Sequence, residues 1–201
     1  MVDRTPPRIS MHSITLTTPR LLLREYRWDD LQAHNALITD PDVMYYIQDV
    51  FSHSFAESLD NLALCAASKY GDPADRDFVF LVMADPVSGE YMGGIGYSVL
   101  ERSPAGKRVE FGYFLQRKHW GHGYASEALA ELLRYAFEED GAWRVDGTCV
   151  ADNLRSARVM EKCGLVFEGE RRNYEWHVDS LKSRRYYGIL KEEWEEQHGK
   201  R

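Results

Sequence analysis

The sequence has few cysteines, no long apolar run and no basic excess, and each absence argues against a class of protein. Cys65, Cys149 and Cys163 are an odd number of cysteines, widely spaced among apolar neighbours. They indicate reduced core thiols rather than a disulfide framework or a metal site. No apolar run reaches the length of a membrane helix, and the N-terminus lacks the basic-then-apolar layout of a signal peptide. We therefore expect a cytoplasmic protein without a membrane partner.

The charge balance and the histidine spacing narrow the function further. A formal net charge of −7 argues against nucleic-acid binding, which requires a basic surface, and would tolerate an amine-bearing substrate. His119 and His122 are separated by a Trp-Gly turn, with no cysteine or carboxylate partner close by. We expect no metal.

The length and apolar content suit one domain with a sizeable core, since 44% of the 201 residues are hydrophobic. We expect an N-terminal tail or edge segment over 1–18, one domain over 19–194 and a charged tail over 195–201. Both a monomer and a homodimer are compatible with the sequence.

Hydrophobic periodicity predicts an α+β or mixed α/β layout. It places helices after Trp28, after Asp40 and after the capping-box residue Ser54. The remaining expected elements are strands at 21–26, 78–84, 91–100, 107–115, 143–150, 166–178 and 183–190, and helices at 124–138 and 153–163.

The stretch from Lys107 to Asp140 contains an alternating strand, a turn with Gly121 and Gly123, and an amphipathic helix. Glycines without Cβ atoms let a phosphate approach the backbone amides, and the helix dipole favours its negative charge. A ligand that carries pyrophosphate is the first hypothesis, although two glycines alone are weak evidence.

One alternative interpretation of 121–126 is a dinucleotide site. Its spacing nearly matches G-x-G-x-x-G/A, and Asp146 lies about 20 residues further on, where a ribose-binding carboxylate is sought. Three features oppose it: Ser126 replaces the third small residue, Asp146 falls inside its strand, and hairpin-connected strands precede the motif. A Rossmann-type oxidoreductase is the less favoured alternative.

The segments GYFLQRKHWGHGYASEAL and ADNLRSARVMEKCGL together resemble the GCN5-related N-acetyltransferase superfamily, in particular its ribosomal-protein N-terminal alanine and serine acetyltransferases. The resemblance extends over about 18–194, and Thr18-Pro19-Arg20-Leu21 and the closing Tyr187-Gly188-Ile189-Leu190 support it. It implies the acyl-CoA N-acyltransferase fold, a twisted and mostly antiparallel sheet of about seven strands flanked by helices. Acetyl-CoA would be the acetyl donor.

The resemblance also assigns cofactor contacts. The pyrophosphate loop Q/R-x-x-G-x-G/A becomes 118–123, with Lys118 departing from the pattern, and a strand bulge before it would expose two amides to the pantetheine. The expected cofactor residues are Phe114, Leu115, Lys118, Gly121, His122, Gly123, Tyr124, Ala125, Ser126, Asn153 and Ser156. Asn153 and Ser126 could equally be helix-capping residues.

For catalysis, many members use a tyrosine as the acid that protonates the departing thiolate, but Met160 occupies that position here. The resembling branch then suggests Ser156 as the acid and Glu175 as the base. Without a catalytic role, Ser156 would be a hydroxyl in the first turn of a helix, and Glu175 would be a solvated residue of a strand. The cysteines lack a paired histidine, so we expect direct attack by the amine rather than a covalent intermediate.

The amine acceptor is left open as a protein N-terminus or a small-molecule amine. An α-amine of pKa near 7.8 is about 10–15% neutral at pH 7, whereas a lysine side chain is neutral below about one part in a thousand. The loss of the motif tyrosine at Met160 also leaves a non-catalytic acyl-CoA-binding sensor as an alternative.

Overall fold

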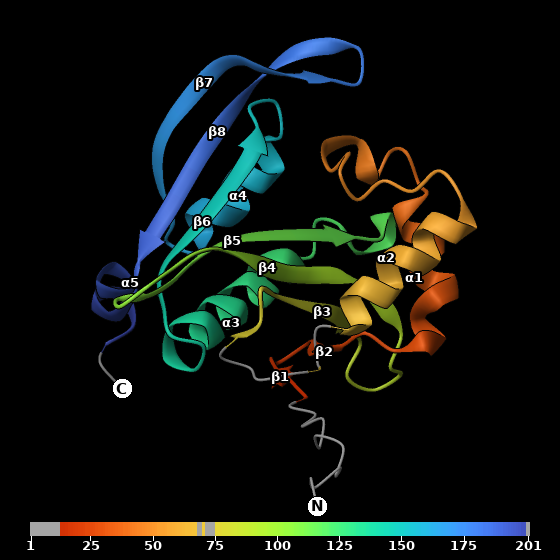
Figure 1. Cartoon of the computed structure of the whole chain (residues 1–201), viewed down its shortest axis with the longest axis horizontal. Helices are drawn as coiled ribbons and strands as arrows, with labels where there is room; N and C mark the ends of the chain where they lie inside the picture. Colours follow the sequence, from red (N-terminus) through yellow and green to blue (C-terminus); the bar gives the residue numbers. More distant parts are fainter. Residues whose placement is uncertain (1–12, 68–69, 71–74, 200–201) are drawn as a thin grey trace, which may run out of the picture.

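The computed structural model describes residues 13–67, 70 and 75–199. Within these residues the strands form one eight-stranded sheet in the order β1-β2-β3-β4-β5-β6-β8-β7. Every neighbouring pair is antiparallel except β5 and β6, which run parallel. The strands are β1 (Thr15–Thr17), β2 (Leu22–Glu25), β3 (Phe78–Ala84), β4 (Tyr91–Ser103), β5 (Gly106–Leu115), β6 (Ala142–Val150), β7 (Val166–His177) and β8 (Ser180–Leu190). The mostly antiparallel α+β fold is confirmed (Figure 1).

Helices cover both faces of the sheet because successive strand residues point to opposite sides. One core joins α3 (Tyr124–Glu138), α4 (Leu154–Lys162) and α5 (Lys191–His198) to one face. A second core joins α1 (Leu31–Ile38) and α2 (Phe55–Ala67) to the other face. Short 3-10 turns occur at Trp28–Asp30 (η1), Met44–Tyr46 (η2) and Arg117–His119 (η4).

Local sequence signals explain where the helices begin. Ser54 Oγ accepts from the Glu57 amide at 3.2 Å and so caps α2, as the sequence predicts, but the Glu57 carboxylate accepts from the His53 amide at 2.7 Å rather than from the Ser54 amide of a complete capping box. Asn153 Oδ1 accepts from the Ser156 amide at 3.1 Å and caps α4. The apolar stripe of α3 faces the core as its periodicity predicts.

The described residues near both ends of the chain form regular elements. Thr15–Thr17 form the edge strand β1, which brings the sheet to eight strands instead of the expected seven. Residues 1–12 lie outside the described residues. The charged C-terminus forms α5, whose Trp194 is only 6% exposed. A single core-facing apolar residue in a charged segment produces too weak a periodicity to predict that helix.

Candidate active site

The parallel strands β5 and β6 separate halfway along their length. They pair from Lys107 opposite Ala142 to Glu110 opposite Asp146. Beyond Glu110, β5 continues to Leu115 alongside β4 alone, and β6 continues to Val150 alongside β8 alone. A gap therefore opens between the two strands on the side where β5 leads into α3, as Figure 1 shows.

Backbone hydrogen bonds show which β5 amides face this gap. The Gln116 amide donates to the Met92 carbonyl of β4 at 2.9 Å. Because partners in an antiparallel pair alternate, Phe114 also bonds toward β4, and Tyr113 and Leu115 point their backbone groups toward β6. Consistent with this, the Leu115 carbonyl accepts from the Trp120 indole at 2.8 Å.

The expected bulge at Phe114 and Leu115 is wrong. The β4–β5 register is regular there, and its one irregularity lies between Val99 and Glu101. Divergence of the strands, rather than a bulge, leaves amides without a strand partner. The geometry therefore favours Tyr113 and Leu115 as the amides that face the gap, while Phe114 pairs with β4 and packs its ring in the core beneath α1 and α2.

The turn between β5 and α3 depends on its two glycines. Gly121 and Gly123 have φ of 79° and 83°, the left-handed region that side chains with a Cβ rarely adopt. Space does not explain them, because a Cβ at Gly121 would meet nothing within 4 Å and one at Gly123 only Arg20 Nη2 at 3.6 Å. Backbone conformation is thus the reason for both glycines.

This turn presents the N-terminus of α3 toward the gap side of the sheet. Gly123 is the N-cap and has no side chain to cap the first amides of the 15-residue helix. The amides at 124–126 have no acceptor within the helix, and together with the helix dipole they would favour an anion such as a diphosphate. Lys118 instead forms an ion pair with Glu90, which directs its charge toward the β3–β4 connection.

Across the gap, the first turn of α4 carries Asn153 and Ser156. Tyr113 of β5 lies beside Ser156; burial raises the pKa of the Tyr113 phenol, and the neighbouring Ser156 hydroxyl partly offsets this. Met160 is fully buried and cannot replace the missing tyrosine. The sequence reasoning missed Tyr113, although its position in the alternating strand before the loop was a usable signal.

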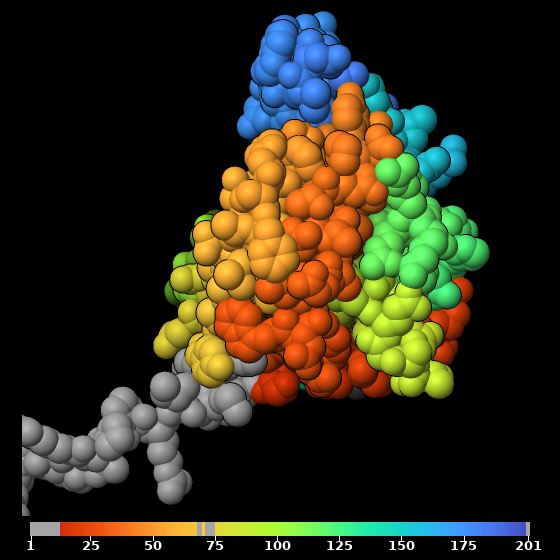
Figure 2. Space-filling model, turned by 90° about the vertical axis from the view of Figure 1, so that its right-hand side faces the viewer, coloured from red at the N-terminus to blue at the C-terminus, as the bar shows by residue number. Residues whose placement is uncertain are grey.

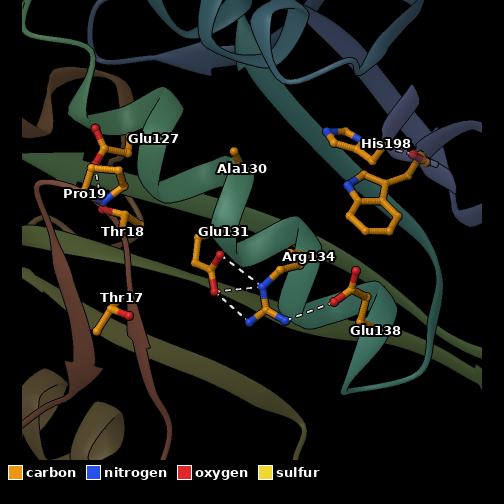
Figure 3. A pocket seen from close by; sticks show the side chains of 10 residues that line it. Thr17, Thr18, Pro19, Glu127, Ala130, Glu131, Arg134, Glu138 and His198 are labelled. Carbon is orange, nitrogen blue, oxygen red and sulfur yellow. Dashed lines mark hydrogen bonds and ion pairs between the residues drawn. The ribbon is translucent and has the colours of Figure 1, made fainter. Parts of the chain in front are cut away.

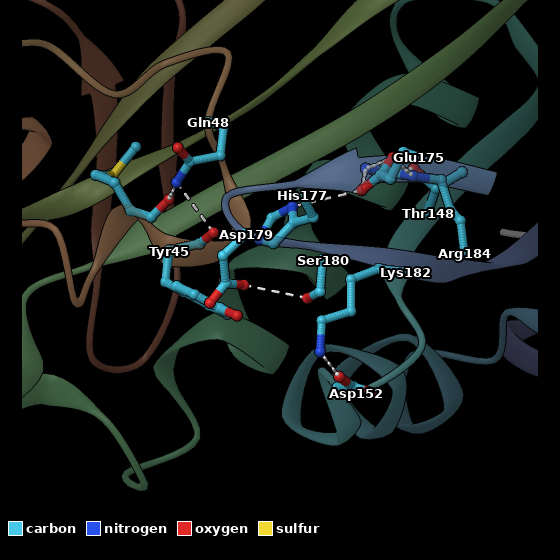
Figure 4. A network of polar contacts seen from close by, with 11 residues as sticks. Tyr45, Gln48, Thr148, Asp152, Glu175, His177, Asp179, Ser180, Lys182 and Arg184 are labelled. Atoms are coloured by element: carbon cyan, nitrogen blue, oxygen red, sulfur yellow. Dashed lines mark hydrogen bonds and ion pairs between the residues drawn. The ribbon is translucent and has the colours of Figure 1, made fainter. Parts of the chain in front are cut away.

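Glu175 is part of a hydrogen-bonded network that begins with Arg184. Its two oxygens accept from Arg184 Nε and Nη2 at 2.8 and 2.9 Å, and Arg184 Nη1 also donates to Thr148 Oγ1 at 2.9 Å. Thr148 in turn donates to Glu110 Oε1 at 2.9 Å, which bridges β6 and β5 where the gap begins. The network links the β7–β8 hairpin to the gap (Figure 4).

On its other side the network reaches His177, which contacts two tyrosines from the N-terminal half of the chain. His177 is 4% exposed, its Nδ1 lies 3.6 Å from Glu175 Oε1, and its ring contacts Tyr45 and Tyr46 at 5.0 and 6.1 Å between centroids. Figure 2 shows the side on which the orange N-terminal segments meet the blue hairpin. Neither tyrosine stood out in the sequence because the contact joins segments over 130 residues apart.

A cavity of about 300 Å³ lies elsewhere, between the Thr17–Pro19 segment, the outer side of α3 and α5 (Figure 3). Three carboxylates line it, those of Glu127, Glu131 and Glu138. Arg134 also lines the cavity but is paired with Glu131 and Glu138, and Glu127 is paired with Arg20. Because the carboxylates already occupy these arginines, the cavity suits an anionic cofactor poorly and the gap is the better candidate site. Among the described residues no cluster of metal-ligating side chains is present and no helix could cross a membrane.

The sequence matches the family described as Acetyltransferase (GNAT) domain over residues 20–166. It is 33% identical over 180 residues to the uncharacterized N-acetyltransferase YnaD of Bacillus subtilis (strain 168), covering 89% of this chain and 98% of that protein. The chain belongs to the GNAT acetyltransferase family, whose members use acetyl-CoA as donor. The resemblance inferred from the two motifs is confirmed, and the dinucleotide oxidoreductase is not supported.

Two solved structures share the fold at lower identity. Spermidine N-acetyltransferase from Vibrio cholerae, in complex with CoA and spermine, superposes with a TM-score of 0.74 at 20% identity, over 88% of this chain and 99% of that chain. Ribosomal-protein-S5-alanine acetyltransferase from Vibrio fischeri has a TM-score of 0.73 at 17% identity, over 90% and 98%.

Proposed function

We propose that this acetyltransferase transfers the acetyl group of acetyl-CoA to a primary amine by direct attack. The observation that carries the proposal is the separation of β5 from β6 beyond Glu110, with the N-terminus of α3 following β5 and the polar network around Glu175 starting at Glu110 and Thr148. Acetyl-CoA supplies the thioester, and the residues around the gap bind, orient and exchange protons.

Cofactor binding is assigned to the backbone first. Amides at 124–126 and the turn at Gly121, His122 and Gly123 would hold the pyrophosphate, with the Ser126 hydroxyl beside them. The amides of Tyr113 and Leu115 would bond the pantetheine arm and the acetyl carbonyl. The backbone amide of Asn153 donates to the Val150 carbonyl, whereas its side-chain nitrogen Nδ2 makes no hydrogen bond within the described part of the chain and would be available as a donor to the same arm.

The cysteines support direct transfer. Burial raises the pKa of Cys65 to about 12 and those of Cys149 and Cys163 to about 11. A thiol of this pKa is almost entirely protonated near neutral pH, and only the thiolate is a useful nucleophile. A ping-pong route through a cysteine is therefore disfavoured.

Ser156 and Glu175 are the proposed acid and base. Ser156 lies in the first turn of α4 with its hydroxyl against Tyr113, so the pair could deliver a proton toward the gap. Arg184 binds both Glu175 oxygens, so Glu175 would act on an amine only when the amine competes with Arg184 for the carboxylate. A largely neutral α-amine would make a weak base sufficient.

The acceptor is proposed as an α-amine of a protein or peptide, or a small-molecule amine. Tyr45, Tyr46 and the Glu175 carboxylate would suit a cationic group, since aromatic faces and carboxylates both attract ammonium. The two fold neighbours act, by their names, on spermidine and on a ribosomal protein, so both acceptor classes occur on this fold. Three free cysteines, of which Cys65 and Cys149 are buried and Cys163 is partly buried, suit action in the cytoplasm.

Calorimetric titration with acetyl-CoA, with NADPH as the control, tests the cofactor assignment. Thiol release is then measured with two acceptors, spermidine and a peptide with a free alanine N-terminus. Turnover with either amine supports the proposal. Acetyl-CoA binding without turnover on any primary amine would instead favour the sensor, and binding of NADPH alone would refute the cofactor assignment.

A further inference from the structure

The segment before β2, which contains Thr18 and Arg20, forms hydrogen bonds and an ion pair with the beginning of α3. Arg20 Nε and Nη2 bind Glu127 Oε2 at 2.7 and 2.6 Å, and Arg20 Nη1 donates to the His122 carbonyl at 3.0 Å. The guanidinium carbon also lies 4.7 Å from the centre of the Tyr124 ring. One side chain therefore connects the last loop residues to the first turn of the helix.

Thr18 completes this contact, which we term the Arg20 clamp: Thr18, Arg20, Glu127 and the His122 carbonyl. The Thr18 hydroxyl and the Arg20 amide donate to Glu127 Oε1 at 2.6 and 2.9 Å. Figure 3 shows Thr18 and Pro19 against Glu127 at the N-terminal end of α3. The Glu127 side chain is 16% exposed and accepts from both donors and from the guanidinium.

The negative charge of Glu127 would oppose the binding of an anion at the beginning of α3. It lies in the first turn of α3, at the helix end whose amides face the proposed diphosphate. Burial raises its pKa, but hydrogen bonds from Thr18 and Arg20 outweigh that effect and lower it overall, so the carboxylate is ionised near neutral pH. Within the screening length of about 10 Å, an uncompensated carboxylate would repel a bound phosphate.

The contact with His122 has a second consequence. In a trans peptide unit the C=O and the following N–H point in opposite directions. When Arg20 holds the His122 carbonyl, the direction of the Gly123 N–H is fixed as well. Without this contact the glycines on either side of His122 could rotate the peptide and turn the carbonyl toward the anion.

We propose that Arg20 is a positioning residue for the coenzyme: it neutralises Glu127 and fixes the peptide between His122 and Gly123, so that the end of α3 presents only donors to a diphosphate. The proposal rests on acetyl-CoA binding at this loop. It assigns a role in the cofactor site to a residue that lies about 100 positions before the loop in the sequence.

Two measurements on the full chain test the proposal. Arg20→Met should weaken acetyl-CoA binding in calorimetry by about fivefold or more, since helix-end charges act at this scale. In the protein without ligand, Arg20→Met should also move the three-bond HN–Hα couplings of Gly123, which report its φ of 83°, toward conformationally averaged values. Arg134→Met is the matched control, because Arg134 bridges Glu131 and Glu138 on the same helix but lies further from the loop.

Each outcome supports or overturns the clamp. Wild-type affinity and Gly123 couplings in Arg20→Met, or equal changes in Arg134→Met, would overturn it. The double variant Arg20→Met/Glu127→Gln should recover part of the affinity, and no recovery would refute the charge argument.

If Arg20→Met does not fold, Arg20→Lys replaces it: averaged Gly123 couplings support the clamp, and wild-type couplings overturn it. Failure of the wild-type chain to bind acetyl-CoA would refute the proposed function, while the coupling measurement would still test the clamp.

Discussion

Replacing Gly123 with valine tests the anion site most directly. Gly123 has φ of 83°, and a Cβ there would meet only Arg20 Nη2 at 3.6 Å, so the cost is backbone strain and not a clash. A residue with a Cβ in the left-handed region costs about 1–2 kcal/mol, and β-branching adds to this. If the loop moves to relieve that strain, the amides at 124–126 no longer converge. Since 1.4 kcal/mol is about tenfold in an equilibrium constant, acetyl-CoA binding should weaken by about tenfold or more.

Gly141 supplies a matched control for this substitution. It follows the other end of α3, has φ of 70°, and a Cβ there would meet nothing within 4 Å. Gly141→Val should lose a similar free energy of unfolding, measured by calorimetric melting, and keep its affinity for acetyl-CoA. A folded Gly123→Val protein with unchanged affinity would refute the phosphate-loop assignment.

The other predictions concern catalysis, the C-terminal helix and pH. Ser156→Ala and Glu175→Gln should each lower kcat by about a hundredfold with acetyl-CoA affinity nearly kept; full activity in either would remove that residue from the mechanism. Trp194→Ala should cost about 3–5 kcal/mol of unfolding free energy in urea melts, whereas Trp176→Ala, with a residue 70% exposed, should cost little. Folding lowers the pKa of Glu127, so the ionised carboxylate stabilises the folded state. This stabilisation is fully present above the unfolded pKa near 4.5 and is lost as the pH falls through the folded pKa. Glu127→Gln should flatten that acid limb, and an unchanged limb would contradict the pairing.

Much of the fold was predictable because its signals are local. The capping residues Ser54 and Asn153 mark helix starts in the sequence and cap them in the structure. A continuous apolar run over β3 and alternation along β5 predicted strands, and the stripe of α3 predicted its buried face. By contrast, α5 was missed because Trp194 alone packs against the core through Phe137, and one residue has no period.

The candidate site was only partly predictable, for a related reason. Glu175 was selected by its position after α4, but nothing near it in the sequence indicated that Arg184 would bind both of its oxygens. Phe114 was assigned by assuming a bulge, whereas the Gln116–Met92 bond determines which β5 amides face β4. Both facts depend on strand pairing, which sequence period alone does not specify.

By itself, the sequence determined the chemistry of the loop, since Gly121, Gly123 and the helix that follows are consecutive and their backbone preferences are intrinsic. It also determined the family, through two motifs that stand close together in the chain. Only the tertiary structure decided that β5 and β6 separate after Glu110, that Tyr45 meets His177, and that Arg20 reaches across 102 positions to the His122 carbonyl. Those contacts are made by residues distant in sequence, and they exist only once the sheet brings the segments together.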